Sequence, residues 1–217
     1  MAEARRLMYP RKGPEFARAL AFSDGLFAIS MTLLVVGITV PTLTDGDSVH
    51  ELAEALNDLT SNFVSFFVSF AVIGRYWVAH HTYFAQLESL DRALIALNLV
   101  YLAFIAFLPF PTALLGTYFE NPLSIVIYAV NVALVSGMEV VLFRHAYRAG
   151  LLKQTIPLNV YRWGAAMSLS PVVFFLLSVP VAFVDTGLAV TVWFLVIPVG
   201  VLGSRWAPEG ADELLVG

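Results

Sequence analysis

One long apolar stretch near the amino terminus restricts the possible folds most strongly. Between Gly25 and Leu43 the sequence contains no charged side chain. A helix over residues 18–41 would be about 36 Å long, which is enough to cross the roughly 30 Å hydrocarbon core of a bilayer. Arg18 and Asp24 lie in its first two turns, where a charged side chain is costly unless it finds a partner. The stretch therefore predicts a membrane-spanning helix with a charged beginning.

Similar apolar stretches recur along the whole chain. The 217 residues are 59% hydrophobic and 13% charged, whereas soluble domains are about 45–50% apolar and about 25% charged. The expected fold class is an all-α membrane protein with six transmembrane helices per subunit. Its predicted parts are an amino-terminal arm at 1–16, a membrane domain at 17–204 and a polar tail at 205–217. The predicted spans are 17–41, 59–80, 93–115, 122–144, 161–184 and 187–204.

The distribution of charge supports this count. All twelve Lys and Arg can be assigned to one side of the predicted membrane, where they lie in the arm or the tail, at the start of the first span, or in and beside the connections. The connections on the other side contain acidic residues and neither Lys nor Arg. This pattern follows the positive-inside rule, so we expect a multi-pass protein of the cell membrane with both termini in the cytoplasm.

The sequence contains none of the motifs that mark a soluble catalytic domain. A Gly-rich phosphate loop, a GxSxG motif and an HExxH motif are all absent, and there is no Cys. The predicted connections are short, so any function has to be built from the helices. We expect neither enzymatic activity, nor a cofactor, nor a nucleic-acid partner.

One face of the first span groups residues that could line a narrow pore. Thr32 lies beside this stripe, about 60° from Ile29, whereas Asp24 lies on a different face. Ordinary helix packing accounts for an apolar stripe as well as a pore that closes by constriction or dewetting does. The pattern alone leaves both interpretations open. The stripe consists of six residues that lie within about 40° of one line at 100° per residue, namely Arg18, Phe22, Gly25, Ile29, Leu33 and Val36.

The start of this span resembles a known family. The sequence Arg18-x-x-x-Phe22-Ser23-Asp24 is similar to the R-x-x-x-F-S-D signature of the transmembrane protein 175 family of potassium channels. The resemblance is specific over the first two spans, and the second half of the chain agrees mainly in helix count and topology. Further residues in agreement are Trp77, His80 and His81 at the end of the second span and Asn98 in the third.

The resemblance implies a potassium-preferring cation channel built as a homotetramer, because a single six-helix repeat is similar to the prokaryotic members of the family. It implies that the first helix of each subunit lines a central pore, with Ile29, Leu33 and Val36 as the hydrophobic constriction. Thr32 matches a position implicated in potassium preference. The sequence lacks a TVGYG filter, so selectivity would depend on a hydroxyl layer, partial dehydration and pore width. The implied partners are further copies of the chain, membrane lipid and permeant potassium ions.

Asp24 points away from the predicted pore, so we expect a structural role for it. The resemblance implies that Ser23 and Asp24 form a network with Trp77, His80 and His81 that holds the helices together; a direct part in gating is the alternative. Adjacent helical residues diverge by about 100°, so His80 and His81 do not predict a metal site.

Two other classes of function stay open from the residues alone. An ion- or proton-coupled secondary transporter would need paired carboxylates in the membrane or broken helices in an internal repeat. Asp24 and Glu139 are the membrane carboxylates available, and we expect Arg144 or Arg148 to satisfy Glu139. An intramembrane enzyme would need a Ser/His pair or two Asp residues at matching depth, and neither arrangement is evident in the sequence.

Overall fold

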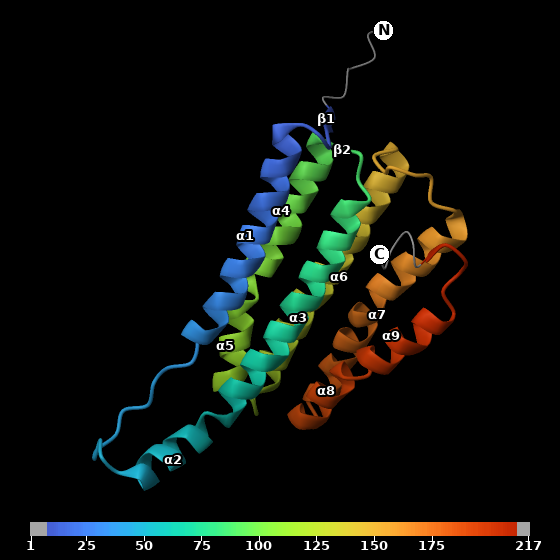
Figure 1. The fold of residues 1–217 in the computed structure, drawn as a ribbon. Helices are drawn as coiled ribbons and strands as arrows, with labels where there is room; N and C mark the ends of the chain where they lie inside the picture. Colours follow the sequence, from blue (N-terminus) through green and yellow to red (C-terminus); the bar gives the residue numbers. More distant parts are fainter. Residues whose placement is uncertain (1–7, 212–217) are drawn as a thin grey trace.

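The protein is described by a computed structural model that covers residues 8–211. Six helical segments in this range are long and apolar enough to cross a membrane, which confirms the predicted number of spans. They run up and down beside one another, and a small sheet joins the amino-terminal segment to the bundle at the end where α1 begins (Figure 1). The predicted tail residues 212–217 and the first seven residues of the predicted arm lie outside the described range.

The first helix, α1, covers Pro14–Val36. Proline is favoured at the first helical position, so the helix begins three residues earlier than predicted. It ends at Val36 and Gly37 caps it, whereas we expected the span to continue to residue 41. The sequence after Gly37 explains the difference, because Ile38, Thr39 and Val40 are β-branched and Val40 precedes a proline, which disfavours the helical conformation.

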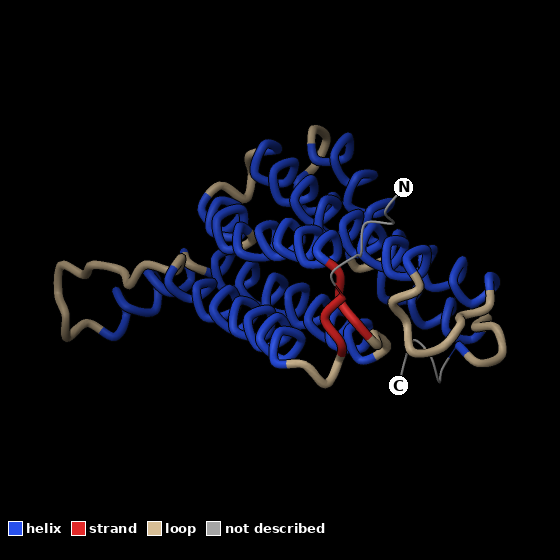
Figure 2. Tube along the Cα trace, turned by 90° about the horizontal axis from the view of Figure 1, so that it is seen from above, coloured by secondary structure: helices blue, strands red, loops and turns tan. Residues whose placement is uncertain are grey.

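The part of the arm that the structure describes is attached to the bundle. Strand β1 (Met8–Pro10) pairs antiparallel with β2 (Ser89–Asp91), with Tyr9 opposite Leu90 (Figure 2). Arg11 follows β1, and its Nη1 atom donates to the carbonyl oxygens of Phe84, Ala85 and Leu87 at distances of 2.9–3.1 Å. The cation thus lies at the carboxyl end of a helix, where the helix dipole favours positive charge. We expected an all-α chain, so this pairing of two strands was not predicted.

The connection after α1 contains a separate helix, α2 (Val49–Asp58), whose amino terminus is capped by the Ser48 hydroxyl. Leu59 separates it from α3 (Thr60–Ala85). Helix α3 continues five residues beyond the predicted end because Phe84 packs into the core. Arg75 therefore lies ten residues before the end of α3, deeper than the position beside the following connection that the charge pattern assigned to it.

Two of the remaining four spans contain breaks close to prolines. The third consists of α4 (Arg92–Phe107) and α5 (Pro109–Thr117), and the sixth consists of α8 (Thr186–Trp193) and α9 (Val196–Arg205). Pro198 has no N–H to donate to the Phe194 carbonyl and its ring crowds that group, which explains the second break. Between them lie α6 (Pro122–Ala149), which ends at Gly150 in the left-handed conformation with φ 69°, and α7 (Leu158–Ala182).

Helix α6 forms the centre of the subunit. It packs against α4, α5, α7 and α8, and it is the most deeply buried of the six spans. Helix α1 lies at one side of the bundle and contacts α3, α4 and α5 (Figure 1). This peripheral position leaves one face of α1 without a neighbour in its own subunit.

Candidate functional site

Helix α1 has two chemically different faces. Its buried face contacts the rest of the subunit through Phe16, Ser23, Phe27, Ser30 and Leu34. The opposite face carries the stripe predicted from the sequence, and Ile29 and Val36 are 60% and 72% exposed on it. Leu33 and Phe22 are also exposed. The subunit alone therefore leaves the predicted constriction residues uncovered, as a surface facing lipid, a pore or another subunit would be.

Thr32 lies on the exposed side of α1 with its hydroxyl in a defined orientation. Its Oγ1 atom donates to the Ile29 carbonyl oxygen at 2.8 Å. Because the hydroxyl hydrogen is used within the helix, the oxygen lone pairs are free to face outward. This geometry makes Thr32 an acceptor, which is the group that a cation would need.

A directional chain of hydrogen bonds lies behind the buried face. The Asn98 amide on α4 donates to Ser23 Oγ at 2.9 Å, and Ser23 donates to the Ala19 carbonyl oxygen. The Asn98 carbonyl oxygen then faces His80 Nε2 at 3.0 Å, so this ring nitrogen must be the donor. The chain joins α1, α3 and α4 through three buried polar side chains.

Aromatic rings enclose His80. Its ring stacks on Phe84 with centroids 4.1 Å apart, and Phe27 and Tyr101 contact its other sides. Its Nδ1 atom has no hydrogen-bond partner in the described part of the chain. Nε2 donates to Asn98 and Nδ1 has no acceptor for a second proton, so these contacts fit the neutral ring with its proton on Nε2.

Asp24 has a separate partner at the edge of the same contact. Trp77 on α3 donates from its indole Nε1 to Asp24 Oδ1 at 3.0 Å. His81 lies against the Trp77 ring, with centroids 5.7 Å apart, and makes no side-chain hydrogen bond within residues 8–211. The structure thus brings Asp24 to Trp77 and links Ser23 to His80 through Asn98, but it leaves His81 outside these hydrogen bonds.

Two signature residues are not part of these hydrogen bonds. Arg18 and Phe22 are exposed and line a hollow of about 260 Å³ between α1 and α4, next to Asn98. No group of three His, Asp or Glu side chains in residues 8–211 is placed to hold a metal ion.

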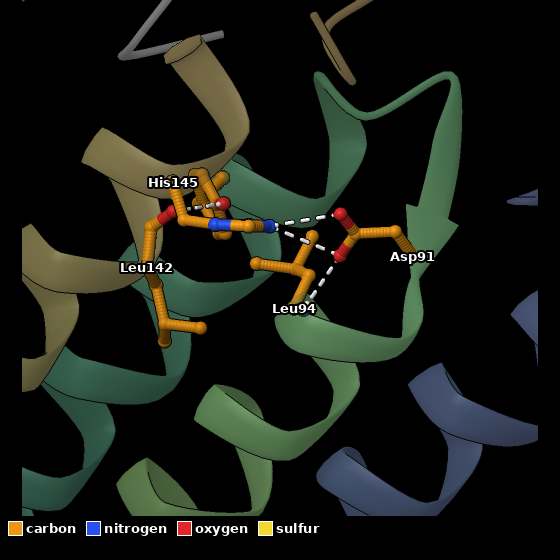
Figure 3. A network of polar contacts seen from close by, with 5 residues as sticks. Asp91, Leu94, Leu142 and His145 are labelled. Atoms are coloured by element: carbon orange, nitrogen blue, oxygen red, sulfur yellow. Dashed lines mark hydrogen bonds and ion pairs between the residues drawn. The ribbon is translucent and has the colours of Figure 1, made fainter. Parts of the chain in front are cut away.

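A second polar contact was not predicted from the sequence. His145 on α6 directs Nε2 to both carboxylate oxygens of Asp91, each at 3.0 Å, and Asp91 also accepts from the Leu94 backbone N–H at 2.7 Å (Figure 3). The carboxylate thus caps α4 and ties β2 to α6. An Asp directly before an apolar helical segment is a capping signal in the sequence, but nothing there indicates His145 as its partner.

Glu139 is placed differently from the expectation. Neither Arg144 nor Arg148 forms an ion pair with it in the described residues. Glu139 lies ten residues before the end of α6 and faces a cavity that it shares with Arg75.

Comparisons with known proteins show what this chain is similar to in sequence and in fold. The family model described as "Endosomal/lysosomal potassium channel TMEM175" matches residues 18–109. A potassium channel of Chamaesiphon minutus is 38% identical over 141 residues, which cover 64% of this chain and 69% of that protein. The chain belongs to the TMEM175 family. This confirms the family that the sequence signature indicated.

Further relatives and solved structures agree with this membership. A potassium channel of Streptomyces collinus is 43% identical over 107 residues, covering 49% of this chain and 50% of that protein. The human endosomal/lysosomal proton channel TMEM175 is 39% identical over 97 residues, covering 42% of this chain and 19% of the human protein. The chain thus spans half or less of these two relatives.

The fold itself is shared with TMEM175 crystal structures. The structure of a lysosomal potassium-selective channel TMEM175 homologue from Chamaesiphon minutus superposes with a TM-score of 0.68 at 30% identity, covering 90% of this chain and 99% of that one. A variant of the potassium channel MtTMEM175, crystallised with a nanobody fusion protein, superposes with a TM-score of 0.62 at 18% identity. This second match covers 93% of this chain and 96% of that one, and it supports the fold alone. The all-α membrane fold with six spans is therefore the fold of TMEM175 channels.

Proposed function

We propose that the protein is a potassium-preferring cation channel in which α1 of four identical subunits lines a central pore. Two relatives that share 38% and 43% identity with the chain carry the name potassium channel. In this proposal the subunits lie in the cell membrane with both termini in the cytoplasm. The proposal includes no catalysis, no bound cofactor and no nucleic acid; the partners are other subunits, lipid and permeant potassium.

The observation that carries the proposal is the exposed apolar stripe of α1. Ile29, Leu33 and Val36 are uncovered, while the opposite face of the same helix is buried against α3 and α4. One such helix cannot enclose a pore, so several copies have to contribute. Facing one another around an axis, the three residues form rings separated by about 6 Å and 4.5 Å along the helix. Rings of branched apolar side chains at this spacing suit a constriction that closes by dewetting.

Thr32 supplies the acceptor for a cation next to the constriction. Its hydroxyl hydrogen is held by the Ile29 carbonyl oxygen, so its lone pairs are the part available to the pore. A ring of such oxygens can replace part of an ion's hydration shell, which favours potassium because it gives up water more readily than sodium does. We therefore assign potassium preference to Thr32 and not to a charged ring.

The buried contacts behind α1 have a mechanical role in this proposal. The Trp77–Asp24 bond and the chain from His80 through Asn98 to Ser23 fix the rotation of α1 about its own axis. This rotation decides whether Ile29 faces the pore. The signature thus acts as a brace, and the stripe forms the conduction path.

Reversal potentials in planar bilayers with potassium and sodium on opposite sides test the proposal. Thr32→Ala is expected to lower the potassium/sodium permeability ratio, and Thr32→Ser, which keeps the hydroxyl, is expected to retain it. Thr39→Ala is the matched control, because Thr39 is an exposed hydroxyl residue beyond the end of α1. An unchanged ratio in Thr32→Ala rejects the role of Thr32.

Flux into proteoliposomes separates a channel from a transporter. A channel gives potassium flux down its own gradient in the absence of any sodium or proton gradient. Flux that requires a second ion gradient would reject the proposal in favour of a coupled transporter. Vertebrate relatives carry the name proton channel, so proton flux is measured in the same vesicles with a pH-sensitive dye.

A further inference from the structure

A cavity lies inside each subunit, away from α1. Its larger part, about 570 Å³, is bounded by α3, α6, α7, α8 and α9, and its smaller part, about 280 Å³, by α3, α6 and α7. Both volumes are close to or within the range of small-molecule sites, about 300–1,000 Å³. The two parts share the side chains of Arg75, Glu139, Trp163, Met167 and Ser168.

The shared wall holds two charged groups at the same depth. Arg75 lies ten residues before the end of α3, and Glu139 lies ten residues before the end of α6. Both are therefore about 15 Å inside the ends of their helices. Within residues 8–211 neither side chain has an ion-pair partner within 4.0 Å. Arg75 and Glu139 attract each other, and Ser168 hydrogen-bonds to Glu139. Charges at membrane depth are stabilised by polar partners, so a polar molecule in the cavity would add contacts to both groups.

The polarity of the cavity changes along its length. The smaller part lies toward the β1–β2 end of the bundle and includes Thr82 and Tyr83. The larger part lies toward the middle of the bundle and is lined mainly by apolar side chains such as Val72, Phe175 and Trp193. A molecule that fits has a polar end toward the membrane surface and an apolar end toward the membrane centre. This is the orientation of a phospholipid in the leaflet on the β1–β2 side.

We propose that this cavity binds one phospholipid with a zwitterionic, primary-amine head group. The phosphate accepts hydrogen bonds from the Arg75 guanidinium, and the ammonium donates to the Glu139 carboxylate. One acyl chain occupies the apolar part. A lipid with a net negative charge matches Arg75 but is repelled by Glu139, and a trimethylammonium group has no N–H to donate. The long arginine side chain extends toward the membrane surface while its stem stays among apolar groups.

Native mass spectrometry tests this assignment with matched lipids. The intact channel is released from micelles that contain equal amounts of phosphatidylethanolamine and phosphatidylglycerol with identical acyl chains. The wild type is expected to retain one molecule of phosphatidylethanolamine per subunit, enriched about tenfold over phosphatidylglycerol, the ratio expected for the gain or loss of one charge-assisted contact. Glu139→Gln is expected to shift this ratio about tenfold toward phosphatidylglycerol. Glu120→Gln, in the connection between α5 and α6, is the control and is expected to leave the ratio unchanged.

A second variant tests the apolar part independently of the charges. Gly200 on α9 lines the larger cavity, and a Cβ atom added there meets no atom within 4 Å. Gly200→Phe adds a ring at the cavity wall and is expected to reduce retained lipid about tenfold. Circular dichroism and subunit mass check that the variant keeps the fold. If the wild type shows no preference for either head group, the proposal is overturned. Water or a neighbouring subunit would then fill the cavity. Enrichment that persists unchanged in both Glu139→Gln and Gly200→Phe also overturns it, because the lipid then lies elsewhere.

Discussion

The hydrogen-bonded chain through Asn98 makes a defined prediction about how α1 is held. Asn98→Leu replaces the amide by an apolar group with the same number of heavy atoms, so that packing volume changes little. His80 then loses the acceptor of its Nε2–H, and its Nδ1 already has no partner in the described structure. Ser23 loses less, because its hydroxyl still donates to the Ala19 carbonyl oxygen.

The magnitude follows from burial. A buried N–H that loses its acceptor costs about 1–3 kcal/mol, whereas an average interhelical hydrogen bond in a membrane contributes about 0.6 kcal/mol. The larger cost applies to His80, which is 2% exposed and is enclosed by aromatic rings. The smaller cost applies to the bond to Ser23. We expect Asn98→Leu to lower the free energy of unfolding by about 2 kcal/mol, of which about 1.5 kcal/mol comes from His80.

A double-mutant cycle with His80→Phe isolates this contribution. Phenylalanine keeps the stacking on Phe84 but needs no acceptor, so Asn98→Leu in that background costs at most about 0.6 kcal/mol. The expected coupling between the two positions is about 1.5 kcal/mol. Reversible unfolding by dodecyl sulfate in mixed micelles, followed by circular dichroism, measures all four proteins. Leu99→Ala at the next, half-exposed position is the control. If the costs of Asn98→Leu and His80→Phe add within about 0.3 kcal/mol in the double mutant, the reasoning is refuted.

Three further predictions concern the ends of the helices. Asp91→Asn keeps an effective helix cap and loses only the charge that faces His145, whereas Asp91→Ala loses both the cap and the charge. We therefore expect Asp91→Ala to lower the free energy of unfolding by about 1 kcal/mol more than Asp91→Asn does. Equal losses in the same assay contradict the capping role. Gly116→Ala places a Cβ atom 2.8 Å from a side-chain nitrogen on α3, so we expect it to lower the free energy of unfolding by about 1–3 kcal/mol. Gly137→Ala is the control: its Cβ meets nothing within 4 Å, and we expect a neutral or stabilising effect. A reversed order contradicts the close packing of α3 on α5. Backbone N–H groups of the preceding connection bond to the Glu51 carboxylate and lower its pKa. These contacts are therefore present above the ordinary value of 4.5 and are lost as the pH falls through the lowered pKa. Amide exchange followed by NMR measures the protection of these N–H groups, and protection that stays constant over the titration contradicts the prediction.

The six spans could be predicted because uncharged apolar stretches leave few alternatives in a bilayer. The stripe of α1 could also be placed, because helical periodicity relates Ile29 to Leu33 and Val36 without any tertiary information. The exposed face of α1 in the structure is the face that this periodicity groups together. Local sequence thus determines which residues share a face of a helix.

Contacts between distant segments were harder to predict. The pairing of β1 with β2 joins residues about 80 positions apart in the register of Tyr9 and Leu90, and no local pattern couples such short strands. The same holds for Asp91 and His145. Arg75 lies deeper than predicted for a related reason: the predicted second span ends at residue 80, but α3 continues to Ala85 and Phe84 packs into the core. Tertiary packing decided where these helices end.

The charged groups inside the membrane lie in one layer and are divided between two tasks. Asp24, Arg75 and Glu139 are each ten residues from the helix ends at the β1–β2 side, and thus about 15 Å deep. Asp24 is bonded to Trp77 across the contact of α1 with α3, whereas the other two face the cavity on the far side of α3. None of the three lies on the Ile29 face of α1. Arg18, near the start of α1, is the charged member of the Ile29 face. From Gly25 to Val36 a permeant cation in the proposed pore meets hydroxyl and apolar groups only, so its selection there depends on dehydration and not on attraction to a fixed charge.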